Sequence, residues 1–236
     1  MNLQNAKILI TGGSAGLGKS MAEVLIQAGA KVAITGRDLD KLKYVAEDLG
    51  ATPVKCDMTD YARFPQAVAE TAEKLGGLEV LINNAGIGEF ATIDEVTAEQ
   101  FQSIFSVNVF GLALLTQEVV KHFKAQNYGH ILNIASTASL KGFSHGTVYS
   151  ASKFALRGMT QCWQAELRRS NIRVIQINPS EVPTAFNNPE REERSLEPQK
   201  LSPMEISHTV KAVLEMDNRG FIPEVTVWAT NPWREV

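Results

Sequence analysis

Short apolar runs alternate with longer segments of helical periodicity from one end of the chain to the other. The runs at 7–11 (KILIT), 31–35 (KVAIT) and 172–178 (IRVIQIN) are apolar on both faces, as is usual for parallel strands that helices cover on both sides. Right-handed crossovers between such strands give a doubly wound sheet. We therefore predict an α/β fold in which one parallel sheet has helices on both faces.

The same pattern sets the expected elements. Strands are expected at 7–11, 31–35, 53–56, 79–83, 129–135, 172–178 and 224–229, and helices at 17–28, 38–49, 61–75, 97–125, 147–169 and 202–216. The segment 187–200 is charged and lacks periodicity, and a long loop inside a compact domain is usually functional or mobile. Two interpretations stay open for it, a substrate lid over 185–201 and a plain solvated insertion.

Charge and composition argue against several classes of partner. The net charge of -3 provides no basic footprint for nucleic acid. No apolar run approaches the roughly 20 residues of a membrane span, and the start of the chain lacks a secretory pattern. Cys56 and Cys162 have neither metal nor disulfide spacing, which is typical of reduced thiols. We expect a cytoplasmic protein without a membrane or nucleic-acid partner and without a bound metal.

A glycine-rich turn, TGGSAGLGKS at 11–20, follows the first predicted strand. Gly12, Gly16 and Gly18 match a dinucleotide-binding turn (TGxxxGxG), whereas 13–20 match GxxxxGK[ST], the phosphate loop of triphosphatases. In both, glycines let the backbone approach phosphate and a helix N-terminus supplies free amides. The triphosphatase interpretation also needs an acid ending a buried strand to organise magnesium. Since only Asp57, after the weak third strand, could serve, we favour the dinucleotide interpretation.

Tyr149 and Lys153 lie four residues apart in the predicted helix 147–169, with Ser136 upstream. Positions i and i+4 share a helix face, so the Lys153 ammonium can lie near the Tyr149 hydroxyl. A free phenol has a pKa of about 10, and a neighbouring cation lowers it. A phenol tuned toward neutrality is a useful general acid or base for a carbonyl/alcohol pair.

Taken together, these motifs resemble those of the short-chain dehydrogenase/reductase family. The motifs that carry the resemblance run in the family order from the first strand to Thr184, and they are TGGSAGLG at 11–18, NNAG at 83–86, Asn108 followed by Gly111, Ser136, and YSASK at 149–153. The resemblance implies a single-domain Rossmann-type sheet of about seven parallel strands over residues 1–236, and hydride transfer with a nicotinamide cofactor. It also implies a homodimer or homotetramer that pairs through the helices at 97–125 and 147–169.

The resemblance assigns four catalytic roles. Tyr149 would be the general acid/base, and Ser136 would hydrogen-bond the substrate oxygen and stabilise its developing charge. Lys153 would bind the nicotinamide ribose and lower the pKa of Tyr149. Asn108 would hold a water in a proton relay to Lys153. Ser139 is a neighbouring hydroxyl, but the strand end and the family spacing favour Ser136.

The resemblance also implies cofactor contacts after several strands. Asp57 matches the acid that hydrogen-bonds the adenine amino group, with a helix N-cap as the alternative. Residues 84–86 would line the cofactor and brace the sheet. The full expected set is Gly12, Ser14, Gly16, Leu17, Gly18, Arg37, Asp57, Met58, Asn84, Ala85, Gly86, Tyr149, Lys153, Val182 and Thr184.

The end of the second strand bears on the choice of cofactor. NAD-binding turns place an acid there on the ribose 2′-hydroxyl, whereas this chain has Gly36 and then Arg37. A guanidinium suits bidentate phosphate binding, and Ser14 could add a hydroxyl. Asp38 is better interpreted as a first-turn helix acid, and Ala15 adds no charge where many NADP-preferring relatives have a basic residue. We favour NADP(H) over NAD(H).

The expected reaction is reduction of a carbonyl to an alcohol, or the reverse. The first substrate candidate is a 3-oxoacyl thioester on acyl carrier protein, and a small ketone, aldehyde or 3-hydroxy acid is the alternative. An acidic carrier predicts a basic patch near the site, to which Arg168, Arg169, Arg191 and Arg194 could contribute. Ser180 stands where the family usually has glycine, which leaves the local turn open. A dinucleotide-sensing binding module is the non-enzyme alternative, against which the complete Ser-Tyr-Lys set argues.

Overall fold

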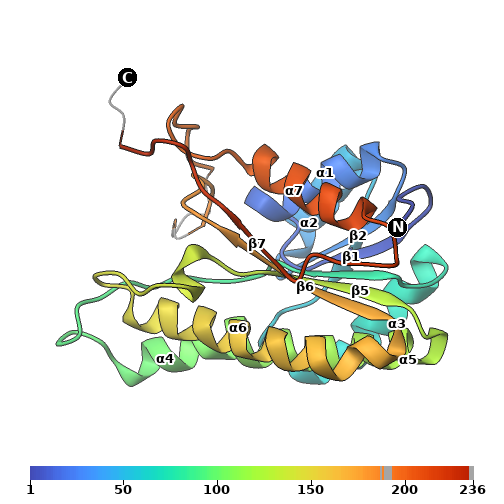
Figure 1. The fold of residues 1–236 in the computed structure, drawn as a ribbon, viewed down its shortest axis with the longest axis horizontal. Helices are drawn as coiled ribbons and strands as arrows, with labels where there is room; N and C mark the ends of the chain where they lie inside the picture. The colour runs from blue at the N-terminus through green and yellow to red at the C-terminus, as the bar shows by residue number, and fades with distance from the viewer. Residues whose placement is uncertain (187, 189–192, 234–236) are drawn as a thin grey trace.

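One parallel sheet organises the residues that the computed structural model describes, which are 1–186, 188 and 193–233 (Figure 1). Its strand order is β3-β2-β1-β4-β5-β6-β7. This confirms the predicted α/β fold with a doubly wound parallel sheet of about seven strands. The strands are β1 (Lys7–Ile10), β2 (Lys31–Gly36), β3 (Thr52–Lys55), β4 (Val80–Asn83), β5 (Gly129–Ile134), β6 (Ile172–Pro179) and β7 (Glu224–Val227).

The register shows why the central strands are rich in apolar residues on both faces. Ile8 of β1 pairs with Val32 of β2 on one side and with Val80 of β4 on the other, and every residue of β5 and β6 is buried. Strands covered on both faces lose the polar alternation of half-exposed strands. The chain order reverses on either side of β1, so the carboxyl ends of β1 and β4 border a crevice where open α/β sheets bind ligands.

Helices cover both faces of the sheet (Figure 1). On one face lie α1 (Gly16–Gln27), α2 (Leu39–Leu49) and α7 (Pro203–Glu215). On the other lie α3 (Phe64–Leu75), α5 (Leu112–Gln126) and α6 (Thr147–Leu167), with α4 (Ala98–Phe105) beside α6. Each layer has its own buried cluster, the first including Leu25 and Leu214 and the second including Phe64, Phe123 and Leu167.

The expected helix at 97–125 begins as predicted but is not a continuous α-helix. Thr97 caps it in a capping box with Gln100. Between α4 and α5 lies a π-helical segment, η2 (Ser106–Gly111). A side chain at Gly111 would lie 2.0 Å from the Met58 carbonyl oxygen, so the widened turn is built around a close backbone contact. Such π segments are frequent at functional sites, and this one carries Asn108.

Two other expected helices are 3₁₀-helical rather than α-helical at one end. The segment at 61–75 begins with a 3₁₀ turn, η1 (Tyr61–Arg63), before α3, and the segment at 147–169 ends with η4 (Arg168–Ser170) after α6. Short 3₁₀ turns are common at helix ends. A further 3₁₀ turn, η3 (Thr137–Ser139), follows β5.

The helical stretch Ala98–Gln126 corrects one expectation from the sequence. By length and composition it could cross a membrane, with a mean hydropathy of 1.5 over its most apolar window, of which 44% is buried inside the structure. Leu115, Val119 and Phe123 of this stretch are buried in the cluster beneath the sheet. The high hydropathy of this stretch is therefore explained by its packing against the sheet as a core helix.

Candidate active site

A pocket of about 1070 Å³ opens at the carboxyl edge of the sheet. Most of the expected site residues line it, namely Gly12, Ser14, Gly16, Leu17, Arg37, Asp57, Met58, Asn84, Ala85, Gly86, Ser136, Tyr149, Lys153, Val182 and Thr184. Gly18 and Asn108 are not among the lining residues, and each lies directly behind one of them. The topology thus brings together residues from six separate loops.

The glycine turn has the geometry of a phosphate cradle. Gly12 and Gly16 adopt positive φ values of 66° and 53°, which favour glycine. A side chain at Gly18 would lie 2.2 Å from the Gly12 carbonyl oxygen, so the turn closes tightly only with glycine there. Ala15, the N-cap residue of helix α1, makes no side-chain cap hydrogen bond, and the first amide of the helix, that of Gly16, binds the carboxylate of Glu193, so this helix start already holds an anion. The turn therefore fits a dinucleotide pyrophosphate.

At the far end of the pocket, the end of β2 offers cations and a hydroxyl. Arg37 and Lys41 both line this end, and Ser14 lies beside Gly36, where a Cβ would be 3.4 Å from the Ser14 hydroxyl oxygen, an ordinary van der Waals contact. Asp38 is the N-cap of α2 and accepts hydrogen bonds from the backbone N–H groups of Asp40 and Lys41, each at 3.0 Å. Its Oδ1 is thus engaged by the first turn of α2, and Asp38 itself lines the pocket beside Arg37.

The expected adenine acid has a local structural role as well. Asp57 Oδ1 accepts hydrogen bonds from the backbone N–H and the hydroxyl of Thr59, at 2.9 and 2.8 Å. This contact stabilises a local turn. The helix N-cap alternative for Asp57 is wrong, because the N-cap residue of η1 is Asp60 and that of α3 is Arg63. Asp57 and the buried Met58 both line the pocket, and the adenine contact of Asp57 stays a prediction.

Asn84 links β1 to β4 at the edge of the pocket. Its Nδ2 donates to the carbonyl oxygens of Thr11 and Gly12, at 2.9 and 3.1 Å. The Thr11 hydroxyl in turn accepts from the backbone N–H groups of Asn84 and Ala85, each at 3.0 Å. Residues 84–86 were expected both to line the cofactor and to brace the sheet, and these hydrogen bonds show the bracing. Thr11 takes part in it, because its hydroxyl accepts the hydrogen bonds from the Asn84 and Ala85 amides.

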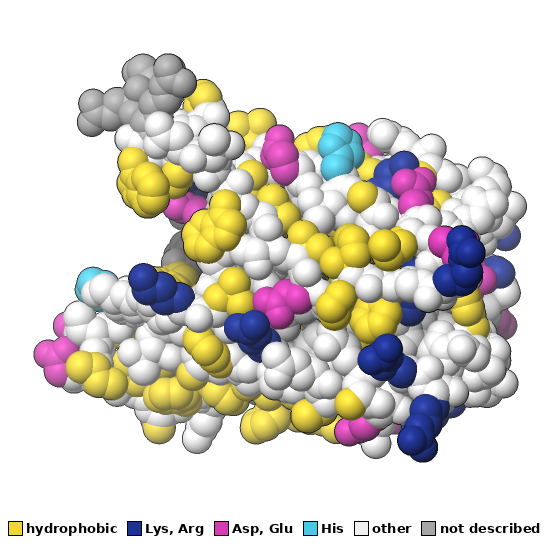
Figure 2. Space-filling view, viewed as in Figure 1, with side chains coloured by type: hydrophobic (Ala, Val, Ile, Leu, Met, Phe, Trp, Pro, Cys, Tyr) yellow, Lys and Arg dark blue, Asp and Glu magenta, His cyan; other side chains and the backbone are white. Residues whose placement is uncertain are grey.

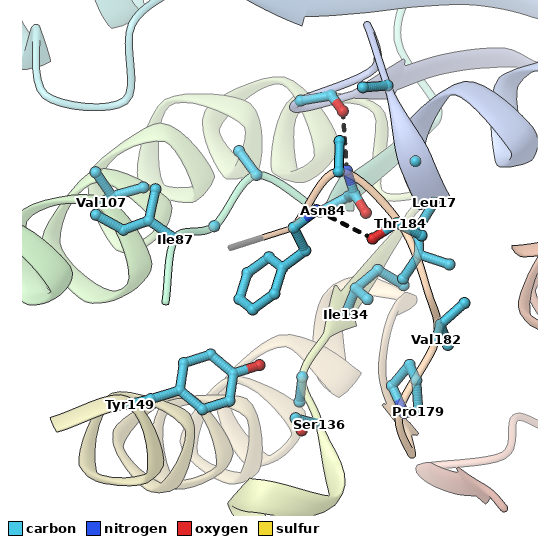
Figure 3. A pocket seen from close by; sticks show the side chains of 18 of the residues that line it. Leu17, Asn84, Ile87, Val107, Ile134, Ser136, Tyr149, Pro179, Val182 and Thr184 are labelled. Atoms are coloured by element: carbon cyan, nitrogen blue, oxygen red, sulfur yellow. Dashed lines mark hydrogen bonds between the residues drawn. The ribbon is translucent and has the colours of Figure 1, made fainter. Parts of the chain in front are cut away.

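Tyr149 and Ser136 face the same space (Figure 3). Tyr149 lies in the first turn of α6 and is 9% exposed, and Ser136 is the N-cap of η3 just past β5. Burial raises the pKa of Tyr149 to about 12, and a hydrogen bond with the Ser136 side chain acts in the opposite direction. The expected net fall of this pKa is therefore wrong, because desolvation of the phenolate dominates; a lowering contribution from Lys153 stays a prediction.

Lys153 lies beneath Tyr149 and is buried. Its Nζ donates a hydrogen bond to the Ile134 carbonyl oxygen at 3.1 Å and lies 5.7 Å from the centroid of the Tyr149 ring. Burial lowers the pKa of the Lys153 ammonium to about 8. The predicted sharing of one helix face is confirmed by this proximity, and the lysine can lose its proton in a range useful for catalysis.

Asn108 is buried behind the site, on the π-helical turn. Its Oδ1 accepts from the backbone N–H of Ile87, and its Nδ2 donates to the Ile87 carbonyl oxygen, both at 2.9 Å. The same Nδ2 lies 3.2 Å from the hydroxyl of Ser152 in α6. Its side chain therefore joins the loop after β4 to the helix that carries Tyr149. The water relay to Lys153 stays a prediction.

The neighbouring hydroxyl of Ser139 points elsewhere. It is fully buried, 2.7 Å from the Ser136 carbonyl oxygen and 3.0 Å from Oδ1 of Asn178. Ser180, which replaces the usual glycine, adopts no positive φ. Its backbone N–H donates to the Val227 carbonyl oxygen at 2.9 Å, and its hydroxyl accepts from the Ala229 N–H at 3.3 Å. Serine thus fits the turn by extending the contact between β6 and β7.

Comparison with known proteins supports the grouping of these motifs. The family model described as short chain dehydrogenase matches residues 6–195. The chain belongs to the short-chain dehydrogenase family.

Individual relatives of this dehydrogenase match over nearly the whole chain. An uncharacterized oxidoreductase of Staphylococcus saprophyticus is 32% identical over 233 residues, covering 96% of this chain and 98% of the relative. The crystal structure of 3-ketoacyl-(acyl-carrier-protein) reductase from Brucella melitensis complexed with NADH has a TM-score of 0.87 and 28% identity, covering 98% and 99% of the two chains. A closed form of serine dehydrogenase complexed with NADP⁺ has a TM-score of 0.85 and 26% identity, covering 93% of each chain. The chain is an oxidoreductase, and these neighbours bind NADH or NADP⁺.

Family membership removes the triphosphatase interpretation of the glycine turn. A phosphate loop directs its lysine to the phosphates. In this dehydrogenase the Lys19 Nζ lies 3.3 Å from Oδ2 of Asp48 in α2, and β4 ends in Asn83 rather than an acid.

Sequence reasoning missed most of the substrate side of the pocket. The missed lining residues are mainly apolar or aromatic and lie in loops without periodicity or motif, and they include Ile87, Phe90, Val107, Phe143, Phe186 and Trp228. Figure 3 shows Ile87 and Val107 together across the cavity from Pro179 and Val182. Lys41 was missed as well; it lies in the first turn of α2, close in sequence to Arg37.

The expected lid at 185–201 is described only in part. Residues 187 and 189–192, and with them Arg191 of the expected basic patch, lie outside the described residues. Ala185, Phe186 and Arg194 line the pocket. Glu193 Oε1 accepts from the backbone N–H of Gly16 at 2.6 Å, so this segment reaches the glycine turn.

The expected basic patch is not assembled by the described arginines. Arg168 and Arg169 follow the end of α6, whose length from Tyr149 places them about 27 Å away at 1.5 Å per residue. Arg194 lies within 3.5 Å of Glu181 and 3.4 Å of Glu197. Lys200 pairs with the same two carboxylates. The charges of this segment therefore largely cancel one another.

Proposed function

We propose that this dehydrogenase is an NADP(H)-dependent reductase that converts a carbonyl to an alcohol, and the reverse. One observation carries the proposal: Tyr149 and Ser136 face one space in the pocket, the buried Lys153 lies beside them, and the glycine turn opens into the same cavity. Proton donor, oxygen-binding hydroxyl and dinucleotide cradle are thus adjacent. A sensor that only binds a dinucleotide has no need of the first two.

A bound nicotinamide would supply the hydride to the substrate carbon or take it back. Tyr149, whose pKa of about 12 keeps it protonated at neutral pH, donates its phenolic proton to the carbonyl oxygen. Ser136 donates a hydrogen bond to that oxygen and stabilises its developing charge. Lys153, mostly charged at neutral pH with a pKa of about 8, binds a ribose hydroxyl and stabilises the phenolate that the transfer leaves.

The remaining lining residues divide between the parts of the cofactor. The turn at Gly12, Gly16 and Gly18 would hold the pyrophosphate on the N-terminus of α1. Asp57 and Met58 would take the adenine, and Asn84–Gly86 the adjoining ribose region. Val182 and Thr184 would meet the nicotinamide amide. Leu17 would pack beside the pyrophosphate, since it follows Gly16 in the first turn.

The preference for NADP(H) rests on the end of β2. Arg37, Lys41 and Ser14 all line the pocket there, while Oδ1 of Asp38 is held by the backbone of α2. A 2′-phosphate would meet two cations, and the engaged Oδ1 of Asp38 makes this residue a weaker acceptor for a ribose 2′-hydroxyl. The similar Brucella structure contains NADH, so the choice must be measured on this chain.

A small free ketone or aldehyde suits the pocket better than a carrier-bound thioester. The resemblance to a 3-ketoacyl-(acyl-carrier-protein) reductase supports the thioester, and the similarity to serine dehydrogenase supports a 3-hydroxy acid. Docking of an acidic carrier would need unpaired cations at the mouth. Arg194 and Lys200 are instead paired with Glu181 and Glu197. We therefore place the thioester second.

We also infer a homo-oligomer that pairs through α4, η2 and α6. Phe101, Phe110 and Phe154 are exposed there, and Figure 2 shows hydrophobic side chains along the lower edge, where α4 and α6 lie. An exposed apolar face of this kind favours association. Met159 and Trp163 instead pack against the buried cluster around Leu156. Sedimentation of the purified protein would distinguish a dimer or tetramer from a monomer.

Three further inferences accompany this function. Residues 1–236 act as one domain, because one sheet runs from Lys7 to Val227. The segment 185–201 acts as a substrate lid, because Phe186 and Arg194 line the pocket. The enzyme works in the cytoplasm, which suits its two unpaired cysteines, Cys56 and Cys162.

Two measurements on the purified protein test the proposed function. Nicotinamide fluorescence titrations should show tighter binding of NADPH than of NADH, and a panel of ketones, aldehydes and 3-oxoacyl thioesters should show NADPH oxidation. Tyr149→Phe should lower turnover by about 10²–10⁴-fold with cofactor affinity unchanged within a few-fold. Tyr44→Phe, which removes an exposed phenol on α2, is the matched control. Full turnover in Tyr149→Phe would remove this residue from the acid/base role.

A further inference from the structure

Two phenyl rings from separate loops contact the Tyr149 ring, and a third ring from another loop packs against one of them. Phe90 follows β4, Phe143 precedes α6 and Phe186 follows β6. The Phe90 and Phe186 ring centroids lie 5.5 and 5.7 Å from that of Tyr149, and Phe143 lies 6.0 Å from Phe90. These are ordinary distances for interacting aromatic pairs. We refer to Phe90, Phe143 and Phe186 as the aromatic wall, and all three line the pocket.

Backbone contacts hold two of the rings together. The Ala91 N–H donates to the His145 carbonyl oxygen at 3.0 Å, and Ala91 pairs with Gly146 in an isolated parallel bridge. This bridge joins the loop after β4 to the loop before α6, and so places Phe90 next to Phe143. A side chain at Gly146 would lie 2.7 Å from the Phe143 ring. Glycine at this position is what lets that ring fold back over the bridge.

The third ring depends on a second glycine. A Cβ at Gly88 would lie 2.8 Å from the Phe186 ring and 3.2 Å from the Phe90 ring. The two rings therefore pack directly over the bare backbone of Gly88. The packing of the aromatic wall thus depends on glycines, because a side chain at Gly88 or Gly146 would collide with its rings.

The wall is incompletely covered in the protein itself. Phe90 is 38% exposed and Phe143 is 51% exposed, and Trp228, which lines the same pocket just past β7, is 63% exposed. Large apolar side chains that line a concave pocket and remain exposed are covered when an apolar ligand binds. Because the Tyr149 ring contacts two rings of the wall, a ligand covered by the wall also has its reacting oxygen near the Tyr149 hydroxyl.

We propose that the pocket selects aryl ketones and the corresponding aryl alcohols, with the aromatic group of the substrate packed against the aromatic wall. The proposal rests on the proposed function for the identity of the reacting group. The ketone Ar–CO–R gains hydride at carbon from the reduced nicotinamide and a proton at oxygen from Tyr149. The products are Ar–CHOH–R and the oxidised nicotinamide. A planar ring gains edge and face contacts from the wall that a carboxylate or a pantetheine amide cannot make.

Binding tests the pocket without requiring turnover. Saturation-transfer NMR on the protein with NADP⁺ would compare 1-phenylethanol, 1-cyclohexylethanol and 3-hydroxybutyrate. We expect 1-phenylethanol to bind the most tightly. The Phe90→Leu/Phe143→Leu variant keeps apolar side chains but removes the rings, and should weaken 1-phenylethanol binding by about fivefold while leaving 3-hydroxybutyrate unchanged. Tyr44→Leu, which removes an exposed ring on α2, is the control.

Turnover separates the two proposals. With NADPH, acetophenone should have a higher kcat/KM than butanone or the N-acetylcysteamine thioester of acetoacetate, and the double variant should lose this preference mainly through KM. Ring-dependent binding of 1-phenylethanol without reduction of any ketone would overturn the proposed function and keep the aryl specificity. Reduction of butanone or the thioester with equal or higher kcat/KM, or binding of 1-phenylethanol that does not depend on the rings, would overturn the aryl specificity alone.

Discussion

The carboxylate of Glu193 binds the first backbone amide of helix α1, at the glycine turn. Its Oε1 accepts a hydrogen bond from the backbone N–H of Gly16 at 2.6 Å, and its Oε2 accepts one from the Ala185 N–H at 3.1 Å. The N-terminus of α1 thus holds a carboxylate at the position that suits a dinucleotide phosphate. The same side chain ties the segment after β6 to the turn, so cofactor and protein anion compete for one site.

Glu193→Gln should therefore tighten NADPH binding. The neutral side-chain amide of the Glu193→Gln variant does not repel the cofactor phosphate, and displacing it from the Gly16 N–H costs less free energy than displacing a carboxylate. An anion at a helix N-terminus is worth roughly 0.3–1 kcal/mol, which corresponds to about a two- to fivefold lower Kd. Fluorescence titration would measure it. Glu73→Gln makes the same charge change on the exposed face of α3 and should have no effect. Unchanged or weaker binding in Glu193→Gln would mean that this carboxylate does not compete with the cofactor.

Arg37→Ala should weaken NADPH binding and spare NADH. A lost hydrogen bond to a charged group costs about 1.5–3 kcal/mol, and NADH lacks the 2′-phosphate that Arg37 would meet. Lys41→Ala should act in the same direction with a smaller effect, because lysine offers a single point charge. Lys43→Ala, an exposed neighbour on α2, is the control for net charge. Equal losses for both cofactors would show that Arg37 does not contact the 2′-phosphate.

The part of this site that follows from spacing was predictable from the sequence. Gly12, Gly16 and Gly18 must follow a strand and open a helix, and Tyr149 and Lys153 must share a helix face. The strands at the centre of the sheet were equally readable, because burial on both faces leaves runs such as Lys7–Ile10 (KILI) and Val80–Asn83 (VLIN) mostly apolar. Gly50 and Gly76 end their helices in the left-handed conformation, as helix-terminating glycines do.

What depends on contacts between distant segments was not predictable. The π-helical turn at Asn108 depends on Gly111 meeting the Met58 carbonyl, and nothing in the local helical pattern encodes that contact. The aromatic wall depends on the pairing of Ala91 with His145. The pKa of Tyr149 was expected to fall because Lys153 is near in sequence. Burial raises it instead, and desolvation is set by the surrounding packing.

The two adjacent serines should respond differently to replacement. Ser136→Ala should lower kcat by about 10²–10³-fold, the usual effect of removing a donor to a developing oxyanion, with little change in stability. Ser139→Ala should instead destabilise the fold by about 1 kcal/mol, because it removes the buried hydrogen bonds of the Ser139 hydroxyl to the Ser136 carbonyl and Asn178 Oδ1, each of which keeps another donor. Urea unfolding and steady-state kinetics on both variants would measure this. A large kcat loss in a fully folded Ser139→Ala would reverse the assignment.

Lys153→Met should abolish reduction and yet stabilise the fold at pH 7. Burial lowers the pKa of Lys153 from 10.5 to about 8. Below pH 8 the native protein therefore carries a buried ammonium that the unfolded chain keeps in water, at a cost of about 3 kcal/mol at 1.36 kcal/mol per pKa unit. The lost hydrogen bond of this charged group to Ile134 offsets about 1.5–3 kcal/mol of the gain, which leaves a net gain of about 1 kcal/mol.

The stability difference between Lys153→Met and the wild type should depend on pH. Between pH 8 and 10.5 the native state has released the Lys153 proton while the unfolded chain still binds it, so the stability contributed at this site rises with pH in the wild type. The Lys153→Met variant lacks that rise. Its advantage should be largest at pH 7 and should vanish near pH 10.5, as urea unfolding across this range would show. Lys121→Met, an exposed lysine on α5, should show no such trend. A Lys153→Met variant that is less stable at pH 7, or whose advantage is independent of pH, would mean that the Lys153 ammonium is not desolvated in the folded protein.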